Sequence, residues 1–474
     1  MDQSSGNQVG SGTPRRTSRS RLLWRAALGS SVAIALAIPS APAVAVVEST
    51  APYLVKDINP TGASNPRDFI DVDGTLYFTA NDGIHGRELW KSDGTQLGTT
   101  LVKDIRPGAG GSWASDLTKV GDRLFFVAND GVHGRELWKS DGTSSGTKLV
   151  KDLNPGPPDS PRLWYLTGAG DTLFFTHYTR RYGRELWKSD GTSAGTRIVK
   201  DIYPGHRGSK PYGLIALGDR IFFGARSSSS PDATFQLYEL FMSDGSASGT
   251  RLVPSPHVSW PGSGAVVGPR LFVLLSCDPY YCSDPGVWTG TGLAGESTRE
   301  SIPPYHAFDL VAVGSRGFFL DTENHLWRTD GTAAHTRKVS DLPPCGDNLD
   351  DDSCAYNLTA ASNRLFFVLP RYEWFPEDGY YERVRDELWV SDRTAAGTGS
   401  ILDNFPHGGE LRELGGAIYF ANGGAIWKSD GTDTGTSLAA SVAGYPSALT
   451  RVGGGLFFST NDGTHGQELW RYVP

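Results

Sequence analysis

The sequence predicts an all-β fold: a β-propeller of about nine four-stranded blades. Three observations predict it. One motif recurs nine times, each clear copy contains four short strand-like segments, and the two ends of the chain hold complementary parts of one unit. A repeat period of 40–50 residues is typical of propellers and related arrays. Eight blades is the alternative, because the fifth and eighth copies are weak.

The repeat is clearest in the first half of the chain. Residues 81–105 read NDGIHGRELWKSDGTQLGTTLVKDI, and residues 129–153 read NDGVHGRELWKSDGTSSGTKLVKDL. Each copy has an aromatic residue at one place, and successive anchors lie 38 to 62 residues apart. The nine anchors are Trp90, Trp138, Trp187, Phe241, Trp288, Trp327, Trp389, Trp427 and Trp470.

Residues 115–153 show the unit in full. Residues 115–120 alternate as a short strand does, residues 123–128 form an aromatic strand without a polar face, and residues 135–140 and 148–153 form two more. An Asp-Gly turn joins the second strand to the third. Four short strands, with a middle one buried on both faces, are what a packed propeller blade requires.

The two ends of the chain predict how the ring closes. Residues 53–58 (YLVKDI) are a fourth strand with no blade before it, and the chain ends in a third strand with no fourth after it. We expect residues 53–58 to pair with the last blade. Such pairing removes an exposed sheet edge, which would otherwise favour aggregation.

Several segments carry a family resemblance. ELWKSDGT, GTKLVKDL and RLFFVANDG resemble the ELWxxDGT-repeat proteins of bacteria, named after their motif. The resemblance covers about 420 residues; copies one to three match well, and copies four to eight depart from the pattern. It implies an exported repeat architecture and provides no catalytic residues to transfer.

Residues 1–45 are predicted to be a signal peptide. Five arginines precede an apolar run at residues 26–38, and an A-x-A pattern follows at residues 43–45. The run is too short to span a bilayer. Arg15-Arg16 leaves both general secretory and twin-arginine export open. We expect one propeller domain over residues 46–474, either secreted or held in the periplasm or at the cell surface.

The net charge of the chain limits the class of ligand that it can bind. Residues 1–45 contain five arginines and one aspartate, so their removal changes the net charge from −8 to −12. Nucleic-acid-binding proteins are usually basic, so this balance argues against that class of ligand. It is compatible with an extracellular glycan or protein ligand.

The four cysteines are predicted to form disulfides, because their number is even and the context is extracellular. The pairs Cys277–Cys282 and Cys345–Cys354 would each close a short loop. A zinc site is the alternative. Its C-x4-C and C-x8-C spacings lack a nearby histidine pair, which favours disulfides.

Polar residues repeat with the motif, and repetition favours a structural role. His85, His133 and His465 share one position on three successive blades, but neighbouring sheets lie about 10 Å apart, too far to share one zinc ion. Aspartates of DGT are expected to bond their own turn, similar in placement to the Asp-box turns of sialidase propellers. The glutamates of ELW are expected to link blades. Two G-x-S-x-G matches join strands, not a strand to a helix.

Function is expected where the repeat is broken. Four long insertions, at residues 225–236, 276–286, 342–357 and 369–386, all belong to blades four to seven. In a four-stranded meander, the second-to-third connection and the connection to the next blade leave by the same face. The insertions therefore gather on one face, where recognition loops on a rigid scaffold are common.

These insertions carry two candidate sites. The first is a group of aromatic residues, which could bind sugar rings or a protein surface, or could pack the loops onto themselves. Its members are Tyr280, Tyr281, Tyr372, Trp374, Phe375, Tyr380 and Tyr381. A cluster of carboxylates is either solvated or binds calcium; it consists of Asp347, Asp350, Asp351 and Asp352.

Two classes of function follow. The first is an exported, non-catalytic protein that binds a glycan or protein ligand through the loop face of blades four to seven. The alternative is an exported polysaccharide hydrolase or lyase, whose acid and base would come from that face. Its candidates are Glu373, Glu377, Asp378, Glu382 and His306.

Overall fold

In the computed structural model, the chain separates into two units, residues Met1–Val47 and Glu48–Pro474. The structure describes residues 51–153, 163–227, 238–253, 260–276, 286–291, 298–301, 307–343, 354–375, 380–407 and 409–474. The predicted signal peptide therefore lies outside the described residues. Within the described ranges, no helix has the length and apolar character needed to cross a bilayer.

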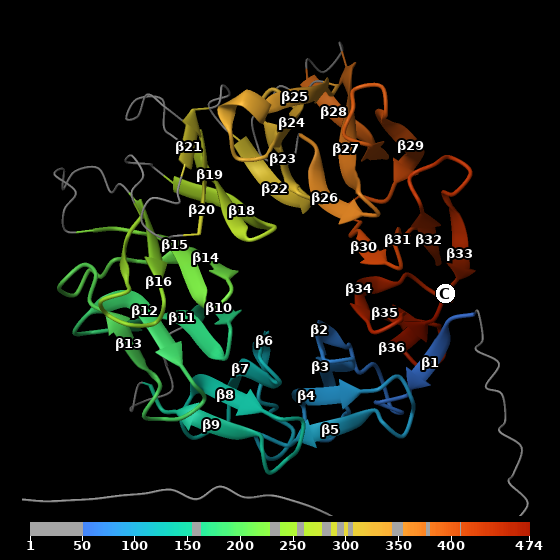
Figure 1. Ribbon diagram of the computed structural model, residues 1–474. Helices are drawn as coiled ribbons and strands as arrows, with labels where there is room; N and C mark the ends of the chain where they lie inside the picture. Colours follow the sequence, from blue (N-terminus) through green and yellow to red (C-terminus); the bar gives the residue numbers. More distant parts are fainter. Residues whose placement is uncertain are drawn as a thin grey trace, which may run out of the picture. The chain divides into compact units, whose positions relative to one another are not determined.

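Within these ranges, 36 strands form nine four-stranded antiparallel sheets, arranged as a ring of blades (Figure 1). Blades one and two are β2 (Arg67–Val72), β3 (Thr75–Asn81), β4 (Arg87–Ser92), β5 (Thr100–Lys103), β6 (Ser115–Val120), β7 (Arg123–Asn129), β8 (Arg135–Ser140) and β9 (Lys148–Lys151). Blades three and four are β10 (Leu163–Ala169), β11 (Thr172–Thr179), β12 (Gly183–Ser189), β13 (Arg197–Lys200), β14 (Tyr212–Leu217), β15 (Arg220–Ala225), β16 (Glu239–Ser243) and β17 (Arg251–Leu252).

The later blades follow the same order. Blades five and six are β18 (Trp260–Val267), β19 (Arg270–Ser276), β20 (Gly286–Gly290), β21 (Thr298–Ser301), β22 (Ala307–Val313), β23 (Arg316–Asp321), β24 (His325–Thr329) and β25 (Arg337–Asp341), with a 3-10 turn η1 (Ala333–His335). Blades seven and eight are β26 (Tyr356–Ala361), β27 (Arg364–Phe375), β28 (Tyr380–Ser391), β29 (Thr398–Phe405), β30 (Arg412–Leu414), β31 (Ala417–Ala421), β32 (Ala425–Ser429) and β33 (Ser437–Ser441). Blade nine is β34 (Ser447–Val452), β35 (Gly455–Asn461), β36 (Gln467–Tyr472) and β1 (Tyr53–Lys56).

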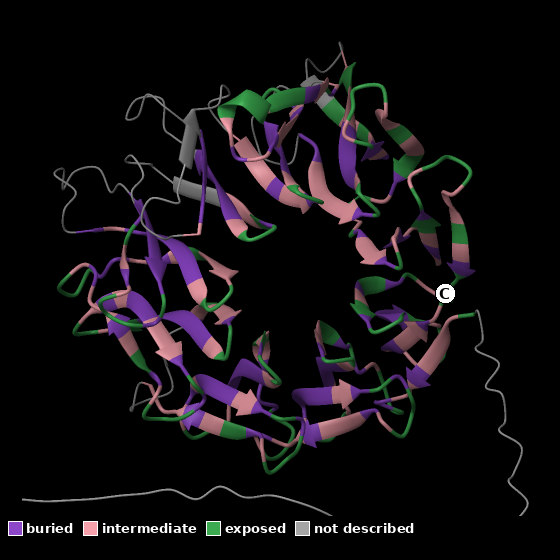
Figure 2. Ribbon diagram, in the orientation of Figure 1, coloured by how far each residue is buried: buried purple, intermediate pink, exposed green. Residues whose placement is uncertain are grey.

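The count of nine blades is confirmed, and the alternative of eight is wrong. The weak fifth and eighth copies each form a complete four-stranded sheet. Each of the nine anchor aromatics lies on the third strand of its blade and pairs with a residue of the second strand. Trp90, for example, pairs with Phe78, and Trp470 pairs with Phe458. The described second strands are buried along most of their length, and buried residues lie within the blades in Figure 2.

The core lies between blades. Each of nine apolar clusters joins two neighbouring blades; one, for example, contains Leu89 of blade one and Phe126 of blade two. A blade therefore buries its apolar faces only against its neighbours, as in other repeat proteins. Lysines add polar links: Lys56 Nζ donates to Thr99 O at 2.8 Å, and Lys103 Nζ donates to Thr147 O at 2.9 Å.

The ring closes as the sequence predicts. Strand β1 pairs antiparallel with β36, with Leu54 opposite Trp470 (Figure 1). Val55 and Ile58 are buried in the apolar cluster that joins blades nine and one. The N-terminal strand thus completes the last blade and covers the edge of β36.

Candidate functional site

Much of the predicted loop face lies outside the described residues. This holds for Tyr280, Tyr281, Cys277, Cys282, Cys345, Asp347, Asp350, Asp351, Asp352, His306, Glu377 and Asp378. Their predicted roles, including calcium binding, remain predictions. Cys354 is described: it is buried, and no cysteine in the described part of the chain is free.

The insertion at residues 369–386 is a long hairpin for most of its length. Strands β27 and β28 each have 12 residues, and their pairing continues from Leu365 opposite Ser391 to Phe375 opposite Tyr380. A loop was predicted here; instead, the strands of blade seven extend beyond the blade. Aromatic residues on both arms, Tyr372 and Trp374 on one and Tyr380 and Tyr381 on the other, are of a type that favours strands.

Aromatic residues lie at the end of this hairpin. The side chain of Trp374 is 48% exposed, and Tyr372 lies two positions earlier on β27. Side chains two apart on a strand share one face, so these two rings lie on the same side of the hairpin. On the backbone, Tyr381 pairs with Trp374 and Tyr380 with Phe375. All five predicted aromatics of this insertion are thus brought to one end of the hairpin.

A polar network fixes the base of the hairpin. Arg383 donates to both carboxylate oxygens of the buried Asp386, with Nε at 2.7 Å and Nη2 at 2.6 Å. Tyr356, on β26, donates from its hydroxyl to Asp386 at 2.9 Å, and its ring lies 5.5 Å from the guanidinium of Arg383. A bidentate arginine–carboxylate pair is strong and directional. These contacts therefore hold the base of the hairpin in a fixed position.

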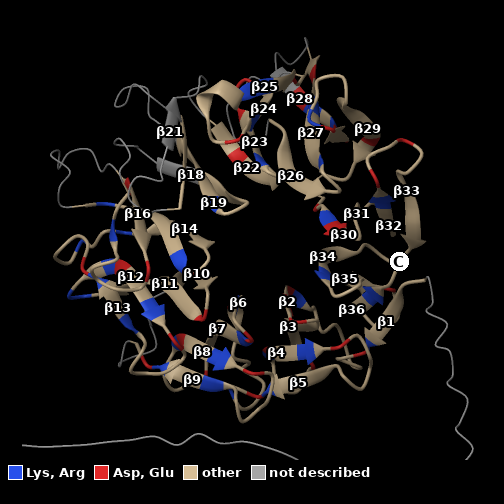
Figure 3. Cartoon of the chain, viewed as in Figure 1, with Lys and Arg blue, Asp and Glu red and all other residues tan. Residues whose placement is uncertain are grey.

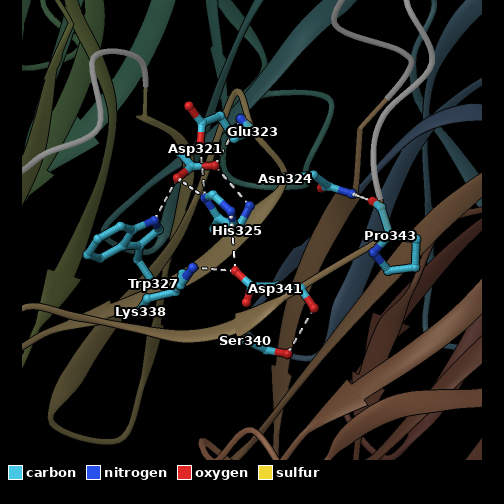
Figure 4. Close-up of polar contacts among 9 residues, drawn as sticks. All are labelled: Asp321, Glu323, Asn324, His325, Trp327, Lys338, Ser340, Asp341 and Pro343. Atoms are coloured by element: carbon cyan, nitrogen blue, oxygen red, sulfur yellow. Dashed lines mark hydrogen bonds and ion pairs between the residues drawn. The ribbon is translucent and has the colours of Figure 1, made fainter.

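The acidic insertion between blades six and seven is held at both ends by one residue. Asn324 is fully buried, and its Nδ2 donates to Pro343 O at 2.5 Å (Figure 4). Its Oδ1 accepts from the N–H of Ala355 at 3.2 Å. Pro343 precedes and Ala355 follows the part of the insertion that lies outside the described residues. Asn324 thus brings the two ends of that segment close together.

Beside Asn324 lies a cluster that the sequence analysis missed. His325 Nδ1 lies 2.8 Å from Oδ2 of the buried Asp321, and its Nε2 lies 3.2 Å from Oδ1 of Asp341 (Figure 4). Trp327 Nε1 also donates to Asp321, at 2.8 Å. Carboxylates contact both ring nitrogens, so neither is open to take a proton from a substrate. The signal was the replacement of ELW by HLW in blade six.

The repeated polar residues have structural partners. Nδ1 of His85, His133 and His465 lies 2.7 Å from the aspartate three positions earlier in its own turn. The contact expected with the histidine's own blade is therefore present. These three contacts recur because the same turn recurs.

The glutamates of ELW link successive blades, as expected. Glu88 Oε2 accepts from the hydroxyl of Ser112 in the connection to blade two, and Glu185 makes the same bond to Ser209 before blade four, both at 2.5 Å. Burial raises the pKa of Glu88 and of Glu185 to about 7, although their hydrogen bonds act in the opposite sense.

Comparisons with known proteins add no function. No protein-family profile and no curated protein matches the chain. The chain is similar to the computationally designed Ika8 protein, with 11% identity, 89% of this chain and 99% of that chain covered, and a TM-score of 0.42. It is also similar to Sqt1 of Saccharomyces cerevisiae, with 12% identity, coverages of 76% and 95%, and a TM-score of 0.42. Likenesses this distant say nothing about a ligand or a reaction.

Proposed function

We propose that this protein is an exported, non-catalytic binding protein of the ELWxxDGT-repeat type. Its ligand is an extracellular glycan or protein, bound by the loop face of blades four to seven. The observation that carries the proposal is the hairpin of blade seven, which places the 48%-exposed Trp374 beside Tyr372. Exposed aromatic anchors on a fixed base are typical of recognition surfaces.

The base of the hairpin supports the proposal further. The bonds from Arg383 and Tyr356 to Asp386 fix the root of the hairpin before any ligand arrives. A pre-ordered surface loses less conformational entropy on binding than a mobile one. The aromatic residues on the hairpin can therefore contribute more of their contact energy to affinity.

The described carboxylates favour binding over hydrolysis. Glu373 and Glu382 were candidates for an acid and a base, and they lie opposite each other on the two arms of the hairpin. Both side chains are exposed. A glycosidase holds its two carboxyl groups on either side of a bound sugar. An exposed ribbon offers no such arrangement.

A screen of the protein without residues 1–45 on a glycan array, with and without calcium, tests the proposal. Trp374→Ala together with Tyr381→Ala should weaken binding at least tenfold, because loss of an anchor commonly costs about 2 kcal/mol. Tyr178→Ala, at a 43%-exposed tyrosine on blade three, is the matched control and should bind normally. Binding of a protein ligand would also support the proposal, provided that the Trp374→Ala and Tyr381→Ala double variant weakens it and Tyr178→Ala does not. Turnover of a polysaccharide, or equal loss in the control, would contradict the proposal.

A further inference from the structure

A hollow of about 580 Å³ lies over blades nine and one and the segment that leads to blade two. Among the residues that line it are Asn65, Arg67, Asn81, Arg87, Trp113 and Gln467. Asn81 ends β3, and Arg87 and Gln467 begin third strands. The hollow is therefore on the face from which second-to-third connections leave, but on the regular blades and not on blades four to seven. Its size is within the range of small-ligand sites.

The charge of this hollow is opposite to that of the protein. It is lined by two arginines and by no carboxylate, while the whole chain has a net charge of −8. Figure 3 shows both signs of charge interspersed around the ring, so this local excess is not part of a broad basic face. A confined positive region of this kind favours an anionic ligand.

The deeper arginine has neutral partners. Arg87 is only 9% exposed, and its Nη1 donates to Asn65 O at 2.9 Å and to Thr79 O at 3.2 Å. Burial, followed by the like charge of Arg67, lowers the pKa of Arg87, and the charge of Asp68 acts in the opposite direction. Among the described residues, no carboxylate forms an ion pair with Arg87. A buried guanidinium that has no direct ion pair is stabilised by an anion that enters the hollow.

The outer arginine is available to a ligand. The side chain of Arg67 is 54% exposed, and its ion pair with Asp68 is loose, with Nε 3.7 Å from Oδ2. Exposed pairs of this length contribute little to stability. Arg67 can therefore turn toward a ligand anion at small cost, and a substitution at this position should leave the fold intact.

Trp113 places a rigid aromatic side chain at the hollow. Its side chain is 52% exposed, its Nε1 donates to Gly110 O at 3.1 Å, and its carbonyl accepts from Arg135 Nη1 at 3.0 Å. Its φ is +52°, a conformation that bulky residues rarely adopt. Asn65 occupies the equivalent place one blade earlier, with φ +47°, and asparagine is well suited to it. An indole at this place is exposed and held in position.

We infer that this hollow is a second binding site, specific for an acidic sugar such as a uronic acid residue of an oligosaccharide. Arg67 and Arg87 would pair with the carboxylate, since guanidinium groups bind carboxylates in a two-pronged geometry. The indole of Trp113 would stack on a face of the ring. The side-chain amides of Asn81 and Gln467 line the same hollow and would bond to hydroxyl groups.

The surroundings leave room for more than one sugar. A second hollow of about 380 Å³ shares Ser447 and Ala448 with the first. It contains Tyr445, which is 80% exposed, and Glu410, whose carboxylate lies 2.6 Å from the guanidinium of Arg412. We therefore expect a trisaccharide to bind more tightly than a monosaccharide.

Isothermal titration with trigalacturonic acid tests the inference on the protein without residues 1–45. The acid should bind, and its neutral methyl ester should bind at least tenfold more weakly. Arg67→Gln and Trp113→Asn should each weaken binding of the acid at least tenfold, with the melting temperature unchanged. Asparagine is chosen because Asn65 already occupies the equivalent place. Trp374→Ala should leave this affinity unchanged, which separates the hollow from the proposed hairpin site.

Each other outcome overturns the inference. Equal binding of the acid and its ester would show that the arginines do not select charge. Equal affinity for acetate, unaffected by Trp113→Asn, would identify a simple anion site. Absence of binding of the acid by the folded protein would show that the hollow is not a uronate site. None of these results bears on the hairpin of blade seven.

Discussion

The hydroxyl of Ser64 donates a 2.6 Å hydrogen bond to Oε2 of Glu468, a residue 404 positions later in the chain. The same carboxylate accepts the N–H groups of Ile58 at 3.0 Å and Ser64 at 2.9 Å. Glu88 and Ser112 form the same contact between blades one and two. The bond that links consecutive blades elsewhere therefore also closes the ring, where it joins the two ends of the described chain.

Removal of the closing strand should open the ring. Deletion of residues 46–60 removes β1, the buried side chains of Val55 and Ile58, and the N–H of Ile58 that Glu468 accepts. The exposed edge of β36 should lower solubility and broaden the thermal unfolding transition. Circular dichroism melts and size-exclusion chromatography measure both effects. Deletion of residues 1–45 alone is the control; an equally sharp melt in the two proteins would contradict the closure.

Stability should increase as the pH falls from about 8 to 5. The pKa of Glu88 and of Glu185 is raised to about 7 by burial, that of Glu468 is raised too, and an unfolded glutamate titrates near 4.5. Between these values the folded state binds more protons than the unfolded state, so the free energy of unfolding falls with rising pH. Hydrogen bonds to Asp82, Asp130 and Asp462 raise the pKa of His85, His133 and His465, which acts in the same direction. Burial lowers the pKa of His177 to about 4, which opposes part of this effect below pH 6.5.

Urea denaturation at several pH values measures this dependence. The triple variant with glutamine at positions 88, 185 and 468 should lose most of the slope, because glutamine resembles the protonated acid and does not titrate. The amide oxygen can still accept from the N–H of Ser112, Ser209 and Ser64, and the amide nitrogen can donate to the serine hydroxyl. The N–H groups of Ile58 and Ile202, which bond to the second carboxylate oxygen, lose their acceptor. An unchanged slope in this variant would show that other groups set the pH dependence.

The repeat was sufficient to predict the architecture, because an aromatic anchor recurs in all nine copies even where the rest of the motif departs from the pattern. The anchor tryptophans, the Asp-Gly turns and the split last blade each point to a ring. The site depends on contacts that no repeat encodes. Asn324 acts across the boundary between blades six and seven, and His325 meets two aspartates that other strands of blade six bring to it. Trp113 and Arg67 line one hollow only because two blades are neighbours in space. The pairing of residues 369–375 was not predicted, because residues 369–386 interrupt the repeat and were expected to form a loop.

Peptide mapping under non-reducing conditions should recover the pairs Cys277–Cys282 and Cys345–Cys354. Cys354 is buried and is not free. Asn324 brings residues 343 and 355 together, which favours a bridge that closes the same insertion. Asn324→Ala should then slow formation of the second pair and leave the first unaffected. A Cys282–Cys345 bridge in the native protein would contradict the assignment.

The DGT turn should show strong coupling between its aspartate and its second glycine. Asp141 Oδ1 accepts from the N–H and the hydroxyl of Thr143, at 2.8 and 2.7 Å, and a Cβ on Gly146 would lie 2.0 Å from the same oxygen. Gly146→Ala must therefore displace the carboxylate and break both bonds. We expect it to cost about 1–3 kcal/mol, as Asp141→Ala does, because each bond contributes about 1 kcal/mol. With Asp141 already alanine, Gly146→Ala should cost less than about 1 kcal/mol, since nothing remains to be displaced.

Urea denaturation of the two single variants and the double variant measures the coupling. Additive losses would show that the glycine is required by its own backbone and not by the aspartate.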